Sequence, residues 1–143
     1  MSTQRYRIDT NVLLRFLRAD HAEHSPAARS VFDAAGAGRC VIVLDAIVLA
    51  EAVWVLSSFY KTEREDIASA LAGLLVQPGI ECADADVLAD ALDRFAAQNL
   101  DFIDCYLAAR SVDGGEAIVT FDGEFRKFGD VLALQPGAAA KTN

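Results

Sequence analysis

The sequence predicts an α/β fold with a largely parallel sheet. Short apolar runs alternate along the chain with longer stretches in which apolar residues recur at helical spacing, as expected when helices connect parallel strands. With 143 residues, 53% of them hydrophobic, the chain is long enough to bury a core without metal or disulfide staples, and disordered or collagen-like classes are excluded. We therefore expect one domain over residues 1–134 and a small, polar and flexible tail over residues 135–143.

The first part of the chain is predicted to form a brief strand and two helices. The strand covers residues 6–8, and apolar residues then recur at helical spacing over residues 12–17. Ser25-Pro26 has the form of an N-cap followed by proline at the first helical position, and this second helix is expected to stop at the glycines of residues 36–38.

Asp45 and the segment Thr62–Glu65 mark two further helix starts. A buried strand over residues 40–44 precedes Asp45, which is placed to cap the next helix. Thr62–Glu65 has the form of a capping box, which opens a helix that ends before Pro78-Gly79. The residues expected on the buried face of that helix are Ile67, Leu71, Leu74 and Leu75.

The remaining strands and helices alternate to the end of the chain. An amphipathic helix is expected over residues 84–97. Its inner face is predicted to consist of Val87, Leu88, Ala91, Leu92 and Phe95. The other expected elements are a strand over residues 80–82, a helix over 103–111, a strand over 117–120, a short helix over 124–128 and a weak strand over 131–134.

Acidic residues outnumber basic residues by 21 to 13, which gives a formal net charge of −8. This balance argues against a protein that holds DNA or RNA by a broad basic face, because nonspecific affinity comes mainly from Lys and Arg neutralising phosphates. It leaves open a nuclease with a small acidic metal site.

Cysteine usage and hydropathy indicate a cytoplasmic protein. The three cysteines are an odd number in apolar or helical contexts and do not suggest a disulfide framework. The N-terminus reaches a charge before an apolar signal segment can form. The most hydrophobic stretch, residues 40–56, contains Asp45 and Glu51 and is interpreted as strand plus helix instead of a membrane span.

Glu51 is the most informative carboxylate in the sequence. It lies within residues 46–56, a helix that is apolar nearly all the way round, which predicts burial on most sides. An ionised carboxylate in such a place is costly unless it is paired, hydrogen-bonded or bound to a cation. The alternative is that Glu51 pairs with an arginine such as Arg15 or faces solvent.

Asp9 and Asp122 each follow a short apolar strand. The carboxyl ends of parallel strands meet at one edge of a sheet, where ligands bind, so both carboxylates are expected at that edge. The alternative for each is an N-cap of the following helix. Asp104 opens the next helix and could be a cap as well, but if it lies one turn inside that helix it is expected to point inward. Asp101, three residues earlier, is assigned the cap or a supporting position.

A hard divalent cation would relieve the repulsion among these carboxylates. Mg²⁺ or Mn²⁺ takes oxygen ligands, keeps waters and accepts phosphate as a further ligand. Zinc is disfavoured because the cysteines lack a zinc spacing and because His21 and His24 are expected on a polar loop surface. Cys105 is expected to pack within a helix, since no histidine follows it in the chain to activate a thiol.

Four segments carry a family resemblance. They are Ile8–Leu14, Leu49–Leu56, Asp101–Ala109 and Ile118–Phe125. In this order and spacing they resemble the PIN-domain ribonucleases, and most closely the VapC-type toxins of prokaryotic toxin–antitoxin modules. The resemblance covers about residues 7–131.

The resemblance implies a parallel sheet with strand order 3-2-1-4-5 flanked by helices, an acidic Mg²⁺ or Mn²⁺ site, endoribonuclease activity, homodimers and a cognate antitoxin protein. The positions that correspond to the family's acidic quartet are Asp9, Glu51, Asp104 and Asp122. Thr10, Asn11 and Thr120 match positions that support the quartet through hydrogen bonds, and Asp101 adds a nearby carboxylate.

The expected activity is hydrolysis of RNA phosphodiester bonds by metal-activated water. Bound metal would neutralise phosphate oxygens and lower the pKa of a bound water. Asp9, Asp104 and Asp122 are expected to bind metal directly, while Glu51 binds metal or holds the attacking water. The side chains expected to position the RNA backbone are Arg15, Arg18, Arg126 and Lys127, with solvated surface charge as the alternative.

Other protein classes fit the sequence less well. A haloacid-dehalogenase-type phosphatase needs a second carboxylate at the position of Asn11. A receiver-like module needs a lysine at the end of its last strand, which this chain lacks. The stronger alternative is a non-catalytic PIN-like protein that dimerises or binds a partner without cleaving RNA.

Overall fold

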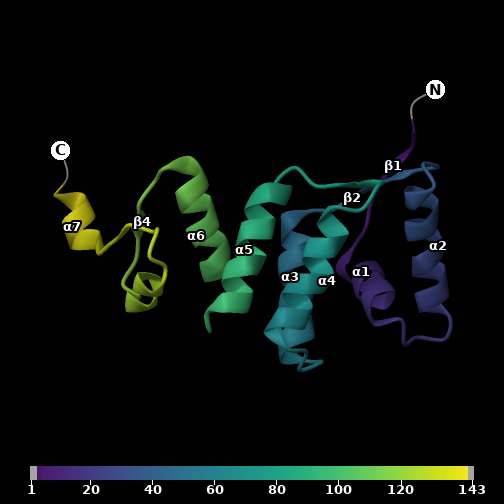
Figure 1. Cartoon of the computed structure of the whole chain (residues 1–143), viewed down its shortest axis with the longest axis horizontal. Coiled ribbons are helices and arrows are strands. Elements are labelled where there is room, and N and C mark those ends of the chain that lie inside the picture. Colours follow the sequence, from purple (N-terminus) through teal and green to yellow (C-terminus); the bar gives the residue numbers. More distant parts are fainter. Residues whose placement is uncertain (1–2, 142–143) are drawn as a thin grey trace. The chain divides into compact units, whose positions relative to one another are not determined.

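The computed structural model describes residues 3–141. The chain divides after Ala85 into two compact units. In each unit, helices pack around short parallel strands (Figure 1). The predicted α/β class with parallel strand pairing is confirmed.

The first unit contains a three-stranded sheet. Its elements in chain order are β1 (Arg5–Arg7), α1 (Thr10–Arg18), α2 (His24–Gly36), β2 (Val41–Val43), α3 (Ala46–Ser58), α4 (Arg64–Leu75) and β3 (Ile80–Glu81). The strands are hydrogen-bonded in the order β1-β2-β3, with Tyr6 beside Ile42 and Ile42 beside Ile80. Because all three strands are parallel, their carboxyl ends lie at one edge, and α1 and α3 start from that edge and pack against each other.

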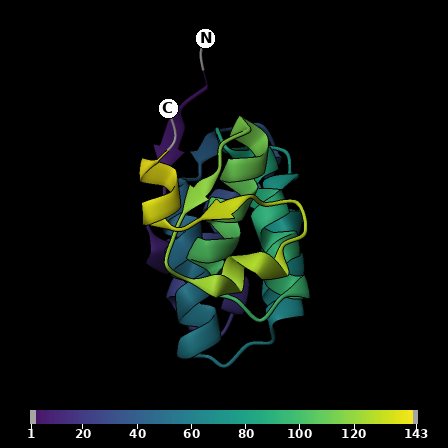
Figure 2. The same ribbon diagram turned by 90° about the vertical axis from the view of Figure 1, so that its left-hand side faces the viewer.

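The second unit contains a two-stranded sheet. Its elements are α5 (Ala85–Ala97), which begins at the last residue of the first unit, α6 (Phe102–Gly114), β4 (Ile118–Val119), the 3₁₀ helix η1 (Gly123–Lys127), β5 (Ala133–Leu134) and α7 (Pro136–Ala140). Figure 2 shows β4 and β5 side by side. They are parallel, with Ile118 beside Ala133.

The strand pairings match two parts of the predicted order 3-2-1-4-5. The first unit has the order 3-2-1 and the second unit has the pair 4-5. In place of the predicted single five-stranded sheet, the described strands form two sheets, one in each unit. The strands β3, β4 and β5 are only two residues long, which limits the number of ladder hydrogen bonds that each can form.

The apolar faces predicted for α4 and α5 are confirmed. The buried residues of α4 include Ile67, Leu71, Leu74 and Leu75, and those of α5 are Val87, Leu88, Ala91, Leu92 and Phe95. Burial of one such large apolar side chain contributes roughly 1.5–3 kcal/mol. These two faces therefore account for much of what holds each helix in its unit.

The predicted N-cap at Ser25 is wrong. Helix α2 begins one residue earlier, at His24, and Ser25 is buried in its first turn. Its Oγ donates a hydrogen bond to the backbone oxygen of Arg15 at 2.8 Å and accepts one from the backbone N–H of His21 at 3.0 Å. Ser25 therefore ties α2 to α1 instead of capping its own helix.

Two other predicted caps also differ from the structure. Asp45 occupies the N-cap position of α3 without a side-chain capping bond, because its carboxylate pairs with Arg7 at 2.6 Å. Helix α4 starts at Arg64, so the N-cap is Glu63 and the predicted capping box, which requires Thr62 at that place, does not form. For Asp45 the competing partner is Arg7, which lies far from it in the sequence.

The segment after Gln135 forms the short helix α7. The flexibility predicted for residues 135–143 and the domain limit at residue 134 stay predictions, and residues 1–2 and 142–143 lie outside the described residues. Within residues 3–141, no helix is both long enough and apolar enough to cross a membrane.

Candidate active site

Asp9 lies where β1 ends and α1 begins. Its backbone is extended, and its Oδ1 accepts a hydrogen bond from the backbone N–H of Val12 at 3.0 Å, which makes it the N-cap of α1. The helix-cap alternative considered for this residue is therefore correct. The cap uses one carboxylate oxygen, and because the residue is exposed the other is open to a ligand.

Glu51 is exposed, and its predicted burial is wrong. Helix α3 buries one side through Leu49, Ala52, Val53 and Leu56. Its other side exposes apolar residues, with Ile47 83% and Trp54 67% exposed. Hydropathy alone therefore overestimated the burial of α3, because apolar side chains also occupy protein surfaces.

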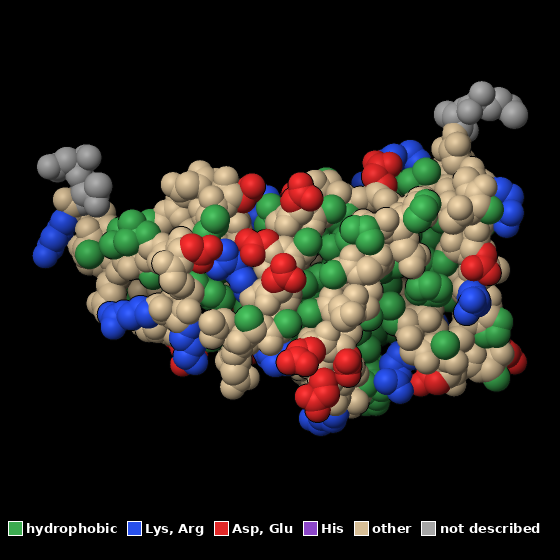
Figure 3. Space-filling view, viewed as in Figure 1, with side chains coloured by type: hydrophobic (Ala, Val, Ile, Leu, Met, Phe, Trp, Pro, Cys, Tyr) green, Lys and Arg blue, Asp and Glu red, His purple; other side chains and the backbone are tan. Residues whose placement is uncertain are grey.

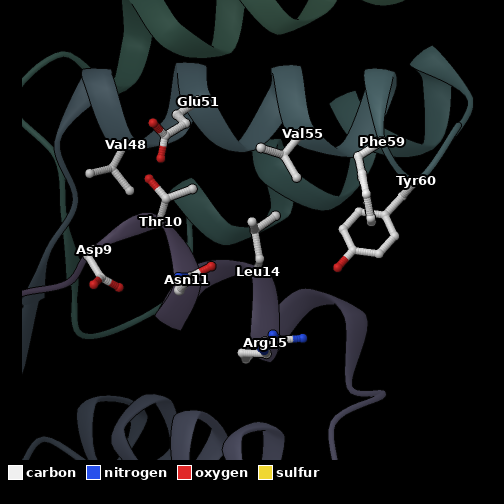
Figure 4. Close-up of a pocket in the computed structure, with 10 residues that line it drawn as sticks. All are labelled: Asp9, Thr10, Asn11, Leu14, Arg15, Val48, Glu51, Val55, Phe59 and Tyr60. Carbon is white, nitrogen blue, oxygen red and sulfur yellow. The ribbon is translucent and has the colours of Figure 1, made fainter.

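Asp9 and Glu51 line one pocket of about 440 Å³ between α1 and α3. Figure 4 shows Asp9, Thr10 and Glu51 at one end of it, with the Glu51 carboxylate directed from α3 toward Thr10 on α1. Asn11 lines the pocket as well. The parallel sheet thus brings two carboxylates from distant parts of the sequence to one cavity, with two small polar side chains beside them.

Arg15 and Arg18 differ in their surroundings. Arg15 lines the pocket from α1. Arg18, at the end of α1, forms an ion pair with Asp20 at 3.1 Å, and its guanidinium carbon lies 3.8 Å from the centre of the Tyr60 ring. Arg18 is therefore held against Tyr60, whereas Arg15 is among the residues that line the cavity.

In the second unit, Asp104 lies in the first turn of α6 and is half-buried. Partial burial raises the pKa of its carboxyl above the ordinary value, and the negative charges of Asp101, Asp122 and Glu124 raise that pKa further. Asp101 occupies the N-cap position of α6 without a side-chain capping bond. Asp101, Asp122 and Glu124 therefore lie close enough to Asp104 for their charges to affect its ionisation.

Asp122 follows β4 and caps η1. Its Oδ1 accepts a hydrogen bond from the backbone N–H of Glu124 at 2.9 Å. Its own N–H donates to Thr120 Oγ1 at 2.9 Å. The helix-cap alternative is again correct, and Thr120 fixes the backbone of Asp122.

The two cations of η1 also differ. Lys127 pairs with Glu124 at 2.9 Å. Arg126 is exposed. Figure 3 shows Lys and Arg side chains scattered among Asp and Glu on the face in view.

The sequence matches the PIN domain family over residues 6–131, a range that contains all four candidate carboxylates. The chain belongs to the PIN domain family. No curated protein matches it. The PIN domain is a nuclease-type fold, and its members typically cleave RNA and usually use divalent metals.

The side chains of this PIN domain suit a hard divalent cation in their chemistry, because the candidate donors are all carboxylate oxygens. They occur as Asp9 and Glu51 in one unit and as Asp104 with Asp122 in the other. Among residues 3–141, no group of three or more His, Cys, Asp or Glu side chains stands close enough together to hold a metal ion. Each pair by itself offers carboxylate oxygens, the kind of ligand that a hard divalent cation takes.

The histidines of this PIN domain have a structural role. His21 Nδ1 accepts hydrogen bonds from the backbone N–H groups of Glu23 and His24 at 3.2 and 2.9 Å, and the two imidazole rings stack with their centres 4.2 Å apart. His21 thus caps the start of α2. Cys105 is buried in α6, as expected for a packing role.

Sequence analysis did not single out Phe59 and Tyr60, which line the pocket of this PIN domain. They directly follow α3, and Lys61, with φ of 55°, then turns the chain away. Two adjacent aromatic residues at the end of an apolar helix were the available signal.

Proposed function

We propose that this PIN domain is a metal-dependent endoribonuclease that hydrolyses RNA phosphodiester bonds. The observation that supports this best is the shared pocket of Asp9 and Glu51 at the strand ends of the first unit. The family match supports it independently, as does the position of Asp101 and Asp122 close enough to raise the pKa of Asp104 in the second unit.

The proposed catalytic and metal-binding residues are Asp9, Glu51, Asp104 and Asp122. A bound Mg²⁺ or Mn²⁺ would supply charge neutralisation at the phosphate and an acidified water. Asp9 and Asp122 each commit one oxygen to a helix cap, which fixes the orientation of the second oxygen as a ligand. Glu51, on the facing helix, is free to bind the cation or to accept a proton from water.

Neighbouring polar groups support these carboxylates in the proposal. Thr10 and Asn11 line the pocket beside Asp9, Thr120 holds the backbone of Asp122, and Asp101 adds negative charge near Asp104. The side chains proposed to position the RNA backbone are Arg15, Arg18, Arg126 and Lys127. Of these, Arg15 has the most direct support because it lines the pocket.

We further propose that the protein is the toxin of a toxin–antitoxin pair, acts in the cytoplasm as a homodimer, and binds a cognate antitoxin protein. The three free cysteines, two of them buried, suit a reducing compartment. The net charge of −8 suits a basic partner segment.

A second candidate is a non-catalytic interaction protein. The observation that favours it is the exposed apolar side of α3, with Ile47 and Trp54. It predicts partner binding without cleavage of any RNA in the presence of any metal.

Purified protein incubated with total RNA and Mg²⁺ or Mn²⁺ separates the two candidates. The nuclease proposal predicts cleavage by the wild type and loss of cleavage in both Asp9→Asn and Asp122→Asn. Unchanged cleavage in both variants would contradict the proposed catalytic site. Absence of cleavage by the wild type would favour the interaction protein.

A further inference from the structure

The pocket between α1 and α3 has two chemically different ends. Figure 4 shows the carboxylates at one end and Phe59 and Tyr60 at the other, with Leu14 and Val55 between them. Its volume of about 440 Å³ lies within the roughly 300–1,000 Å³ of small-ligand sites. The cavity is therefore larger than a cation and its waters require, and its second end offers apolar surface.

The aromatic end is held in place by hydrogen bonds and ring contacts. The N–H groups of Phe59 and Tyr60 both donate to the backbone oxygen of Val55, at 2.9 and 3.2 Å. The two rings meet edge to face, with centres 4.9 Å apart and an angle of 82°. Arg18 lies over the Tyr60 ring. Tyr60 is thus fixed from two sides and supports Phe59.

Phe59 itself has the properties of a stacking platform. Its side chain is 73% exposed although it lines a cavity. The ring contributes little to the core of the unit, and its support by Tyr60 and by the helix end reduces the entropy lost when a planar ligand stacks on it.

We propose that the aromatic end of this pocket binds an unpaired nucleobase of the RNA by stacking on Phe59. This proposal rests on the proposed nuclease function and adds to it a subsite for one base of the RNA, formed by Phe59. A base in a duplex is already stacked between its neighbours, whereas unpaired bases stack on aromatic side chains. Every base presents a π-face, so this contact selects strand state more than base identity.

The other walls of the pocket suit the rest of a nucleotide. Arg15 lines the cavity from α1 and provides a positive charge for a phosphate. The carboxylates at the far end provide the proposed metal site. A nucleotide whose base stacks on Phe59 can therefore also contact Arg15 and the carboxylate end of the pocket. A metal ion alone would use only the carboxylate end, and an apolar peptide would use only the aromatic end.

The test compares two exposed aromatic residues of the same region. Phe59→Ala removes the platform, Phe59→Trp restores it, and Trp54→Ala is the control because Trp54 lies on α3 and is 67% exposed but is not among the residues that line the pocket. All are made in the Asp122→Asn background, which prevents cleavage under the proposed function and leaves the pocket of the first unit intact. Equilibrium binding of a labelled oligoribonucleotide is measured with Mg²⁺, single-stranded and annealed to its complement.

We expect Phe59→Ala to weaken single-strand binding by about 5- to 150-fold, which corresponds to about 1–3 kcal/mol. Phe59→Trp retains the affinity, Trp54→Ala leaves it unchanged, and the duplex binds weakly to every variant. A series of oligonucleotides, each lacking one base at a different position, is bound to the Asp122→Asn protein, which serves as the reference protein. We expect the missing base to lower affinity at one position only. That loss should disappear in Phe59→Ala, because the missing base and the missing ring remove the same contact.

Equal binding by Phe59→Ala and Trp54→Ala, equal binding of single strand and duplex, or undetectable RNA binding by the reference protein would each overturn the proposal. If RNA binding is independent of Phe59, the exposed ring is better explained by recognition of a protein. Cleavage by the wild type is scored separately: cleavage without a Phe59 effect rejects the stacking platform alone, and Phe59-dependent binding without cleavage rejects the nuclease alone.

Discussion

Arg94 binds both carboxylate oxygens of Asp130, with Nη1–Oδ1 and Nη2–Oδ2 distances of 2.8 and 2.6 Å. Its Nε also donates to Asp90 at 3.1 Å, and its side chain is only 11% exposed. This fork ties α5 to the segment that leads into β5 within the second unit, which also carries Asp104 and Asp122.

We predict that Arg94→Ala lowers the free energy of unfolding by about 1–2 kcal/mol, because it removes a bidentate, partly buried ion pair and the packing of the guanidinium on Phe128. The loss of unfolding free energy in Arg94→Lys should be smaller than in Arg94→Ala, since lysine keeps the positive charge but cannot bind both carboxylate oxygens as arginine does. The matched control is Arg29→Ala, whose pair with Asp33 is long and exposed. Urea unfolding measures all three, and equal losses for Arg94→Ala and Arg29→Ala would show that the fork is unimportant.

The same pair predicts a pH dependence of stability. The hydrogen bond from Arg94 holds the pKa of Asp130 below its ordinary value, against a smaller opposing effect of burial. A carboxyl with a lowered folded-state pKa stabilises the protein above its unfolded-state pKa of about 3.9, and that stability is lost as the pH falls through the folded-state pKa. The difference in unfolding free energy between wild type and Asp130→Asn should be constant above about pH 5 and shrink below about pH 4. A difference that grows on acidification contradicts this account.

His21 predicts a second pH dependence, at the start of α2. Its Nδ1 accepts two backbone hydrogen bonds, which a protonated imidazole cannot do. Partial burial lowers the pKa of His21, and the charges of His24 and Arg15 lower it further against the attraction of Asp20. The unfolded chain therefore takes up the proton first, and stability declines as the pH falls through about 6.5. The thermal unfolding of the wild type should show this decline and that of His21→Gln should not, with the amide resonances of Glu23 and His24 shifting in the same range.

Asp9 allows its structural and chemical roles to be separated. Asparagine caps helices about as well as aspartate, whereas alanine costs about 1 kcal/mol. Asp9→Asn should therefore keep the stability of the metal-free protein, and Asp9→Ala should lose about 1 kcal/mol. Added Mn²⁺ should raise the unfolding temperature of the wild type, because a ligand that binds the folded state stabilises it. The rise should be smaller in both variants, because each lacks the Asp9 carboxylate as a metal ligand. An equal rise in all three proteins would remove Asp9 from the metal site.

Sequence patterns predicted the elements well where apolar periodicity was strong. The apolar faces of α4 and α5 are buried as expected, because their apolar residues recur at helical spacing and so lie on one side of each helix. Ile67 and Leu71 in α4 and Leu88 and Leu92 in α5 are examples. The caps failed where a distant partner intervened, as when Arg7 drew the carboxylate of Asp45 away from α3.

The candidate site was predictable in its residue types and less so in its surroundings. Asp9 and Asp122 were placed correctly at strand ends, because strand and cap signals are local. The exposure of Glu51 was missed, since an apolar helix at the surface has the same hydropathy as one in a core. Phe59 and Tyr60 were not predicted, because their place in the site depends on α1 lying opposite them across the pocket.

The central claim is that carboxylates of this PIN domain hydrolyse RNA through a divalent cation. The most direct measurement is the initial rate of RNA cleavage against Mg²⁺ concentration for the wild type, Asp9→Asn and Asp122→Asn, with the cut sites mapped. We predict a saturable rate in the wild type that chelation abolishes and added Mg²⁺ restores, with cleavage lost in both variants. Cleavage that persists in the chelated wild type, or that is equal in all three proteins, would contradict the account.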